Sequence, residues 1–347
     1  MKKVFPCRKY FDITLIKAKN MTKLSVCITY YNQEEFVKES IESVLNLDLP
    51  CELEILAGDD CSTDNTVQII QEYQQKYPDI VKLVINKKNR EKNVINRASL
   101  NRLNLVSRAQ GEYIMFLDGD DFYCDKTFVK EALDVLKDNE DIAACAFNFK
   151  FLHSKKECVF AQKMTEGLIY SREYIAKEYY TPAGAMVFRN TLSAYKLRKL
   201  KEINNFDDNG ITIYFLQYGD IYYINKAVYT YRQQKNSSWN RISKTEQILL
   251  NAMDYKLLYK TAPKFEKEIL KREFPALKYI YKNRKKLPDM LGDNLNKYIE
   301  AAAKNNDKFI YRILNWAELN PLTKLKIKYK YQKWKIDVKY LYRKVKR

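Results

Sequence analysis

The sequence contains very little histidine and glycine, and each shortage excludes a class of site. His153 is the only histidine among 347 residues, so a Ser-His-Asp triad or a histidine-rich zinc centre would depend on one side chain in an apolar setting. Only eight glycines occur, and they form neither a P-loop nor a Gly-x-Gly-x-x-Gly pattern after a strand. Kinases, P-loop ATPases and Rossmann dehydrogenases therefore lose their main support.

Long apolar runs and paired cysteines are missing as well. No run approaches the roughly 20 residues that span a bilayer, and the N-terminus has no apolar core of a signal peptide. The seven cysteines form no Cys-x-x-Cys pair, and their odd number argues against a complete disulfide framework. These absences predict a cytoplasmic protein that is soluble or peripheral on the inner face of the membrane.

Basic residues are in excess, since 62 Lys and Arg stand against 43 Asp and Glu and give a formal net charge of +19. This excess predicts affinity for phosphate groups, whether on nucleotides, nucleic acid or anionic lipid. The charge by itself does not choose among these partners.

Apolar strand patterns alternate with helical ones from residue 24 to residue 117. Strands are expected at 24–29, 52–58, 80–86 and 112–117, and helices at 33–47, 66–77 and 96–109. This order predicts an α/β fold with a mostly parallel sheet and helices on both faces. The polar clusters at 29–32, 58–64 and 118–121 all follow strands, so we expect them at one edge of the sheet, where such folds bind ligands.

The last of these clusters, Asp118-Gly119-Asp120-Asp121, is the most informative. One Asp after a strand often caps a helix or forms a turn, but a cap needs one acceptor and leaves two further carboxylates that repel each other. A divalent cation resolves this repulsion, and oxygen ligands without thiolate or imidazole suit Mg²⁺ or Mn²⁺. Such ions keep positions open for phosphates, so the cluster predicts a metal-bound diphosphate.

Three segments carry a family resemblance: "LSVCITYYNQEEFVKESIESVL", "EILAGDDCSTDNT" and "AQGEYIMFLDGDDFY". Together, and in this order, they resemble the signature blocks of the family 2 glycosyltransferases, and the resemblance extends from residue 24 to about 235. It implies a GT-A fold, a nucleotide-sugar donor and inversion at the anomeric carbon. The domains expected are an extension at 1–22, a GT-A domain at 23–240 and a helical, basic region at 241–347. Within the GT-A domain, 23–125 is expected to bind the nucleotide sugar and 126–240 the acceptor.

The resemblance also implies roles for the donor-side residues. Thr29 and Tyr31 would lie beside the base, where an aromatic face can stack on uracil, and Asp60 would accept the imide proton. Arg102 would face the diphosphate, although a solvated helix face with Arg97 and Arg108 is the alternative. The metal would be held by the cluster, with Asp120 as direct ligand, Asp118 in a second contact or nearer the ribose, and Asp121 taking part. The expected donor-binding residues are Thr29, Tyr31, Asp60, Arg102, Asp118 and Gly119.

In the family pattern, the general base lies in an acidic pair ahead of a helix that ends in glycine and a strand that ends in Tyr-Arg. Asp207 and Asp208 precede Gly219 in this way, so the resemblance implies Asp208 as the base and Asp207 as the second candidate. A helix N-cap is the alternative for the pair. The pair is Asp-Asp where Glu-Asp is more usual, and Gln234 stands where many relatives have histidine. Small residues within 181–189 match the acceptor side.

The last 28 residues, 320–347, hold eleven Lys or Arg and one Asp, and thus +10 of the net charge. Asn320 and Pro321 suit the start of a helix. Apolar residues then recur every three or four positions and predict an amphipathic helix that lies on an anionic membrane near a lipid-linked acceptor. A helix packed on its own domain with solvated lysines is the alternative. The apolar positions are Ile327, Tyr331, Trp334, Val338, Leu341 and Val345.

The sequence thus predicts a metal-dependent inverting glycosyltransferase of cell-surface polysaccharide synthesis. A sugar would pass from a nucleotide donor, expected to be a UDP-sugar, to a hydroxyl of a glycan or lipid-linked acceptor, and no nucleic acid partner is expected. A nucleotidyltransferase that makes nucleotide sugars is one alternative, but "TYYNQEEF" lacks the glycine-rich, lysine-bearing loop that it needs. A noncatalytic nucleic-acid or membrane binder is the other, and it leaves the acidic cluster unexplained.

Overall fold

The computed structural model describes residues 22–86, 94–152, 164–233 and 241–345. Its strands are β1 (Lys23–Tyr30), β2 (Glu52–Asp59), β3 (Val81–Ile85), β4 (Tyr113–Asp118), β5 (Phe122–Tyr123), β6 (Ile142–Phe151), β7 (Gly167–Ile169), β8 (Met186–Arg189) and β9 (Asp220–Tyr231). The helices that accompany them are α1 (Val37–Leu45), α2 (Thr66–Lys76), α3 (Val94–Val106), α4 (Phe128–Asp138), α5 (Ser171–Ala176), α6 (Ala194–Ile203) and α7 (Asp208–Phe215). Helices alone follow: α8 (Lys244–Thr261), α9 (Glu266–Asn283), α10 (Leu287–Leu291), α11 (Leu295–Lys304), α12 (Lys308–Leu314) and α13 (Pro321–Val345).

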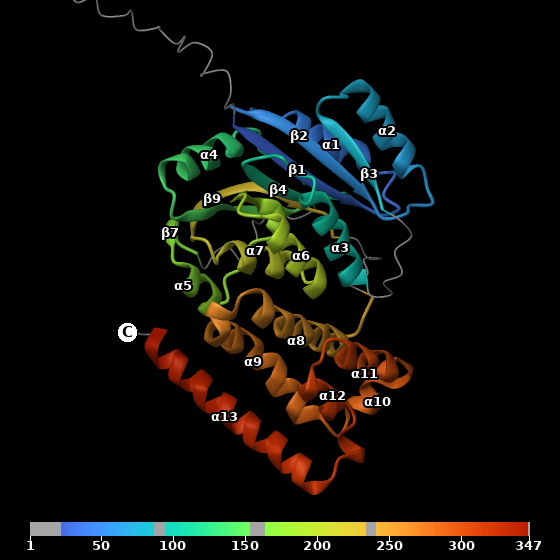
Figure 1. Cartoon of the computed structure of the whole chain (residues 1–347), viewed down its shortest axis with the longest axis vertical. Helices are drawn as coiled ribbons and strands as arrows, with labels where there is room; N and C mark the ends of the chain where they lie inside the picture. Colours follow the sequence, from blue (N-terminus) through green and yellow to red (C-terminus); the bar gives the residue numbers. More distant parts are fainter. Residues whose placement is uncertain (1–21, 87–93, 153–163, 234–240, 346–347) are drawn as a thin grey trace, which may run out of the picture.

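The strands form one sheet in the order β3-β2-β1-β4-β8-β6-β9-β5, and β7 also pairs with β9 (Figure 1). The strands from β3 to β4 are all parallel, as the alternation predicts. Beyond β4 the sheet is mixed, because β8 runs antiparallel to both β4 and β6. The prediction of a parallel sheet is thus confirmed for β1 to β4, where strand and helix patterns alternate regularly in the sequence. The antiparallel strand β8 lies in the later segment, where this alternation ends.

Helices cover both faces of the sheet, as expected for this α/β architecture. Alternate residues of β1 point to opposite faces: Val26 and Ile28 pack in a cluster with α1, α2 and α4, whereas Cys27 packs in a cluster with α3, α5, α6 and α7. Burial on both faces explains the apolar runs at 26–28 in β1, 55–57 in β2 and 113–117 in β4. The cysteines of the described residues are free thiols.

The helices from α8 onward lie below the sheet and form a third cluster (Figure 1), while parts of α8 and α9 also pack in the cluster with α3, α5, α6 and α7. Helix α13 begins at Pro321, so the predicted start is confirmed. Its apolar stripe faces inward: Tyr331 stacks on Tyr281 with ring centroids 4.1 Å apart, and Trp334 meets Phe309 at 4.8 Å. Ile327 and Val338 are also buried. The stripe that was expected to lie on a membrane therefore packs on its own domain, which is the alternative that the sequence left open. The side chains of Leu341 and Val345 lie outside those described.

Within the described residues, no helix combines the length and the apolar character that crossing a membrane requires. His153 and Gln234 both lie outside the described ranges.

Candidate functional site

The carboxyl ends of β1 and β4 bring the first and third polar clusters together. Thr29 lies opposite Asp118 in the parallel register, and its Oγ1 donates a hydrogen bond to Asp118 Oδ1 at 3.2 Å. The backbone N–H of Gly119 donates to the carbonyl of Thr29 at 2.9 Å. A Cβ at position 119 would overlap the ring of Tyr30, which is buried and hydrogen-bonded to Ser40. Glycine is therefore required there by close approach of a fixed aromatic ring.

Arg102 of α3 connects two acidic groups that are far apart in the sequence. Its Nη2 lies 2.6 Å from Asp118 Oδ1 and 4.0 Å from Asp208 Oδ1, and the residue is only 8% exposed. Burial lowers the pKa of Arg102, but Asp118 and Asp208 more than offset this, so its pKa is raised above the usual value. The predicted diphosphate residue is thus a buried cation between the donor-side and the acceptor-side carboxylates.

The three carboxylates after β4 have different surroundings. Asp121 is 1% exposed, its Oδ1 accepts the backbone N–H of Arg232 at 2.7 Å, and its Oδ2 accepts the hydroxyl of Tyr229. Asp118 is the more accessible, with 38% of its side chain exposed. Burial, and then the charge of Asp118, raises the pKa of Asp120 to about 6. Burial and the two neighbouring carboxylates raise the pKa of Asp121 as well.

The carboxylate oxygens of this cluster suit a cation whose coordination shell is completed by oxygens of the substrate. Within the described chain, no group of three or more His, Cys, Asp or Glu forms a ready metal centre. Mg²⁺ and Mn²⁺ in phosphate-handling sites are commonly held by one or two carboxylates together with substrate oxygens and water. Asp118 and Asp120 match that requirement, and a cation would offset the burial and the repulsion from Asp118 that together raise the pKa of Asp120. Both oxygens of Asp121 already accept hydrogen bonds from the protein, so its part in metal binding stays a prediction.

Arg232 borders this cluster and was interpreted from the sequence only as part of a Tyr-Arg strand end. Its Nε donates to the backbone carbonyl of Asp120 at 2.8 Å, its Nη2 pairs with Glu39, and its guanidinium lies 4.5 Å from the ring centroid of Phe36. These partners come from α1 and the β4–β5 turn. Only the Tyr-Arg dipeptide hinted at this position.

Tyr31 and Asp60, which are expected beside the uracil base, are both contacted by Arg97, a residue for which the sequence indicated no role in binding. Arg97 lies over the ring of Tyr31, 4.5 Å from its centroid, and both Nε and Nη2 lie 2.9 Å from Asp60 Oδ2. Tyr31 is exposed and Asp60 is buried. Arg97 was regarded as one more basic residue of the helix before β4, because nothing local indicates that it reaches β1 and β2.

On the acceptor side the two adjacent aspartates have separate partners. Asp207 is the N-cap of α7, and its Oδ1 accepts the N–H of Gly210 at 2.7 Å. Asp208 instead accepts the hydroxyl of Tyr180 at 3.1 Å and faces Arg102. Burial raises the pKa of Asp208 to about 6, Arg102 opposes this rise, and Asp118 and Asp207 add to it. The cap interpretation therefore fits Asp207, and Asp208 is the carboxylate that shares Arg102 with the acidic cluster.

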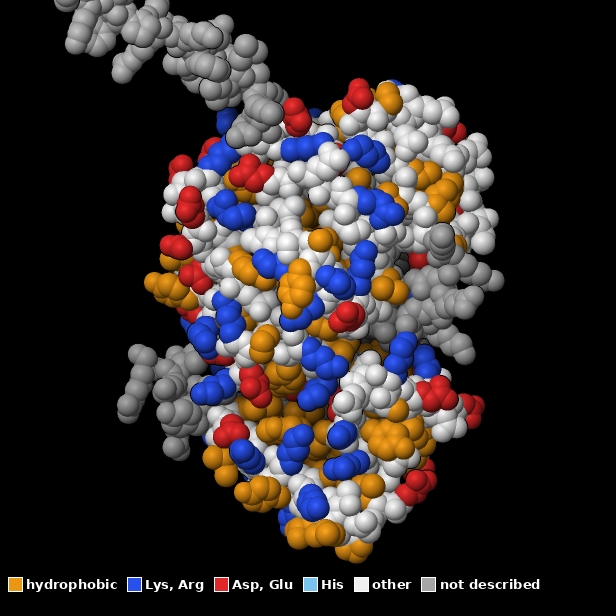
Figure 2. Space-filling model, viewed as in Figure 1, with side chains coloured by type: hydrophobic (Ala, Val, Ile, Leu, Met, Phe, Trp, Pro, Cys, Tyr) orange, Lys and Arg blue, Asp and Glu red, His pale blue; other side chains and the backbone are white. Residues whose placement is uncertain are grey.

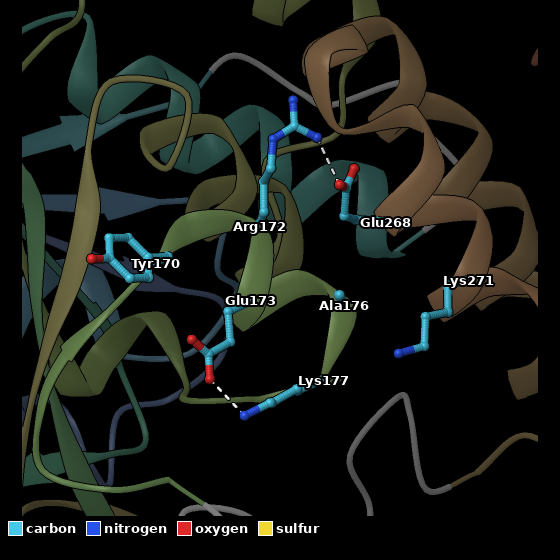
Figure 3. A pocket seen from close by; sticks show the side chains of 7 residues that line it. All are labelled: Tyr170, Arg172, Glu173, Ala176, Lys177, Glu268 and Lys271. Atoms are coloured by element: carbon cyan, nitrogen blue, oxygen red, sulfur yellow. Dashed lines mark hydrogen bonds and ion pairs between the residues drawn. The ribbon is translucent and has the colours of Figure 1, made fainter. Parts of the chain in front are cut away.

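A cavity of about 420 Å³ lies elsewhere, between α5 and α9 (Figure 3). Its charged side chains are largely occupied with one another, since Arg172 pairs with Glu268 and Lys177 pairs with Glu173, both at 2.6 Å. None of the residues expected to bind donor, metal or acceptor lines it.

Comparison with known proteins adds independent observations. The model of a family described as Glycosyl transferase family 2 matches residues 25–203. An uncharacterized glycosyltransferase of Mycoplasma pneumoniae is 34% identical over 188 residues, which cover 54% of this chain and 60% of that protein. The poly(ribitol-phosphate) beta-N-acetylglucosaminyltransferase TarS of Staphylococcus aureus is 27% identical over 173 residues, which cover 50% of this chain and 28% of that protein. The aligned part thus spans 60% or less of the length of these curated relatives.

Solved structures resemble the whole chain in fold. The crystal structure of S. aureus TarS 1–349 in complex with UDP aligns with a TM-score of 0.53 at 20% identity, and covers 93% of this chain and 91% of that one. The same fragment in complex with UDP-GlcNAc aligns with a TM-score of 0.50 at 17% identity, over 84% of this chain and 87% of that one. At these identities the likeness establishes the fold, including the presence of a helical C-terminal region.

The acidic cluster makes a prediction about stability. In metal-free buffer, Asp120→Asn is expected to stabilise the fold by about 1–2 kcal/mol at pH 7 and to have little effect at pH 4. The pKa of Asp120 is raised to about 6, so its contribution to stability is fully present below its unfolded pKa near 4. That contribution is lost as the pH rises through about 6, and the neutral amide avoids the loss. Urea unfolding at both pH values measures the difference.

Asp134→Asn on the exposed side of α4 is the matched control, and should give no pH-dependent gain. Addition of Mn²⁺ at pH 7 should stabilise the native chain more than Asp120→Asn. An equal effect of Asp120→Asn at pH 4 and pH 7 would contradict the interpretation.

Proposed function

Because the chain belongs to glycosyltransferase family 2, we propose that it is a metal-dependent, inverting enzyme that transfers a sugar from a nucleotide donor to a hydroxyl. The proposed donor is a UDP-sugar, and the proposed acceptor is a glycan or a lipid-linked glycan. The observation that carries the proposal is the position of Arg102 between Asp118 and Asp208. One buried cation contacts Asp118 and faces Asp208, and this supports a reaction centre between the two carboxylates.

On the donor side, Asp118 and Asp120 would hold a divalent cation, and this cation would neutralise charge on the departing nucleoside diphosphate. Arg102 adds a fixed positive charge beside the same oxygens and needs no reorganisation, because it is buried and already paired. Arg232 and Tyr229 hold the Asp120-Asp121 turn against β9. These contacts fix the carboxylate of Asp121 and the backbone of Asp120 before a ligand arrives.

On the acceptor side, Asp208 would take the proton from the attacking hydroxyl. A pKa of about 6 leaves this carboxylate mostly ionised at neutral pH and makes it a stronger base than an ordinary aspartate. Tyr180 donates to one of its oxygens and Arg102 faces the other, so its orientation is set from two sides. Attack from the side opposite the diphosphate, in one displacement, inverts the anomeric carbon.

The names of relatives support the substrate classes. TarS is named for transfer of N-acetylglucosamine to poly(ribitol-phosphate), and a Bacillus spizizenii protein that is 35% identical over 103 residues is named poly(ribitol-phosphate) beta-glucosyltransferase. The UDP and UDP-GlcNAc complexes of TarS belong to a protein of the same fold. We therefore propose a cell-surface polymer as the acceptor.

A pair of neighbouring substitutions tests the proposed base. Asp208→Asn is expected to lower transfer by about 10²–10⁴-fold, the usual contribution of a general base, while donor affinity stays within a few-fold. Asp207→Asn keeps a side-chain acceptor for the helix cap and should retain most of the transfer activity. Transfer is measured by mass spectrometry in a broad donor screen with Mn²⁺ or Mg²⁺, and binding is measured by calorimetry.

Asp120→Ala completes this experiment, because it should abolish metal-dependent donor binding. A larger loss of transfer for Asp207→Asn than for Asp208→Asn would reassign the base. A native protein that neither binds, hydrolyses nor transfers any nucleotide sugar would overturn the proposed function.

The contact of Arg97 with Tyr31 and Asp60 gives a prediction about nucleotide affinity. The guanidinium of Arg97 covers the ring of Tyr31 and pairs with the carboxylate of Asp60. A uracil base that stacks on this ring and bonds to this carboxylate must therefore replace the guanidinium. Arg97→Ala is therefore expected to tighten UDP binding roughly three- to tenfold, in line with about 1 kcal/mol for a partly exposed stacked cation. Calorimetry with UDP and Mn²⁺ measures the change.

Arg108→Ala is the control, because Arg108 is an exposed arginine just after the same helix, where it bonds to Asn104. Weaker UDP binding by Arg97→Ala would show that Arg97 helps to hold the base instead of competing with it.

A further inference from the structure

Helix α13 carries a second apolar stripe on the side that faces solvent. Four large apolar side chains recur at intervals of three, four and seven residues, so they share one face of the helix. Their exposed fractions lie between 60% and 73%. From the first to the last, the stripe extends about 21 Å along the helix at 1.5 Å per residue. These outward residues are Leu322, Leu325, Tyr329 and Ile336.

The outward stripe is separate from the stripe that holds the helix in place. Two positions along a helix correspond to a rotation of about 200°, and three outward residues each precede a buried one by two positions. The buried partners pack against the helical cluster, where Tyr331 stacks on Tyr281. The outward residues thus contribute little to folding, and their exposure calls for another explanation. The three pairs are Leu325 and Ile327, Tyr329 and Tyr331, and Ile336 and Val338.

Lysines flank the outward stripe on both sides. On a helical projection, Lys326 and Lys333 lie along one edge of the stripe, and Lys328, Lys335 and Lys339 lie along the other. All five are exposed. In Figure 2, blue and orange side chains are interspersed over the lower part of the molecule, where α13 runs. An apolar centre with basic margins is the pattern of a helix that lies in the headgroup region of a bilayer.

We propose that this outward face of α13 docks on an anionic lipid surface. The four apolar side chains would enter the boundary between headgroups and acyl chains, and the flanking lysines would meet the negative headgroups. Charge complementarity selects this occupant over a second copy of the chain, since two such faces would bring their lysines together. It also selects lipid over nucleic acid, because binding to phosphates alone leaves the apolar stripe without a partner.

The consequence for function rests on the proposed transferase activity, whereas the docking itself does not. A transferase held with α13 flat on the membrane would meet lipid-linked or membrane-anchored acceptors in two dimensions, which raises their effective concentration. The sequence placed the membrane surface on the stripe that includes Trp334; the structure assigns it to the opposite side of the same helix.

Vesicle co-sedimentation tests the proposal on the full chain. The native protein is expected to pellet with vesicles of equal parts phosphatidylglycerol and phosphatidylcholine, but not with phosphatidylcholine alone. The triple variant Leu325→Ser, Tyr329→Ser and Ile336→Ser should lower the partition coefficient at least tenfold. A variant with Lys326, Lys328, Lys333 and Lys335 changed to Gln should lose the salt-sensitive part of binding.

The matched control is a triple serine variant of exposed apolar residues outside α13, at Leu168, Tyr170 and Tyr195, which should bind as the native chain does. Thermal unfolding and donor hydrolysis in solution, measured on every variant, separate loss of docking from loss of fold or of the proposed function. Tyr329→Trp supplies a second readout, because its fluorescence should shift to the blue when the stripe enters the bilayer.

Failure of the native protein to pellet, or undiminished binding by the α13 triple serine variant, would overturn the proposal. Equal binding to neutral and anionic vesicles would overturn the part assigned to the lysines. Binding of RNA that competes with vesicles and is unaffected by the serine substitutions would identify the face as a nucleic-acid surface instead.

Discussion

The arrangement of the site depends on one electrostatic constraint: several carboxylates must stay close together although their like charges repel. Arg102 offsets part of this negative charge, because its buried guanidinium lies between Asp118 and Asp208. Arg232 adds a second positive charge beside the cluster, and it bonds to the Asp120-Asp121 turn through its side chain and its backbone. Burial, together with the charges of neighbouring carboxylates, raises the pKa of Asp120 and of Asp208. A metal-bound diphosphate would add the missing positive charge at the metal and present its own negative charge to Arg102.

Adjacent aspartates that look equivalent in the sequence have different partners in the structure. Asp120 and Asp121 are neighbours, yet Asp121 is buried with both oxygens hydrogen-bonded, whereas Asp120 is the member that we propose as a metal ligand. Asp207 and Asp208 are neighbours too, but one caps α7 and the other faces Arg102. In both pairs, adjacent carboxylates thus have different partners and different surroundings.

Helix α13 likewise has two apolar sides that look alike in the sequence but have different surroundings in the structure. A sequence with apolar residues on two sides of a helix does not indicate which side the protein covers. Packing against α9 and α12 covers the side with Tyr331 and Trp334, and leaves the side with Tyr329 and its flanking lysines in solvent. The exposed side is the one that has to be explained by a partner.

The sequence by itself determined the elements that depend on local periodicity. Apolar runs and amphipathic repeats placed β1 to β4 and their helices within a few residues. The family match at 25–203 confirms the resemblance over that range, while the part from 204 to about 235 stays a prediction. The ends of parallel strands meet at one sheet edge, so the convergence of Thr29 and Asp118 was also predictable. Only the tertiary structure decided which charges face one another. Arg97 with Tyr31, Arg102 with Asp208 and Tyr229 with Asp121 join residues from distant segments, and such contacts leave no periodic signal in the chain. The mixed half of the sheet and the covered side of α13 were decided in the same way, because both depend on which surfaces remain available once the rest of the chain has packed.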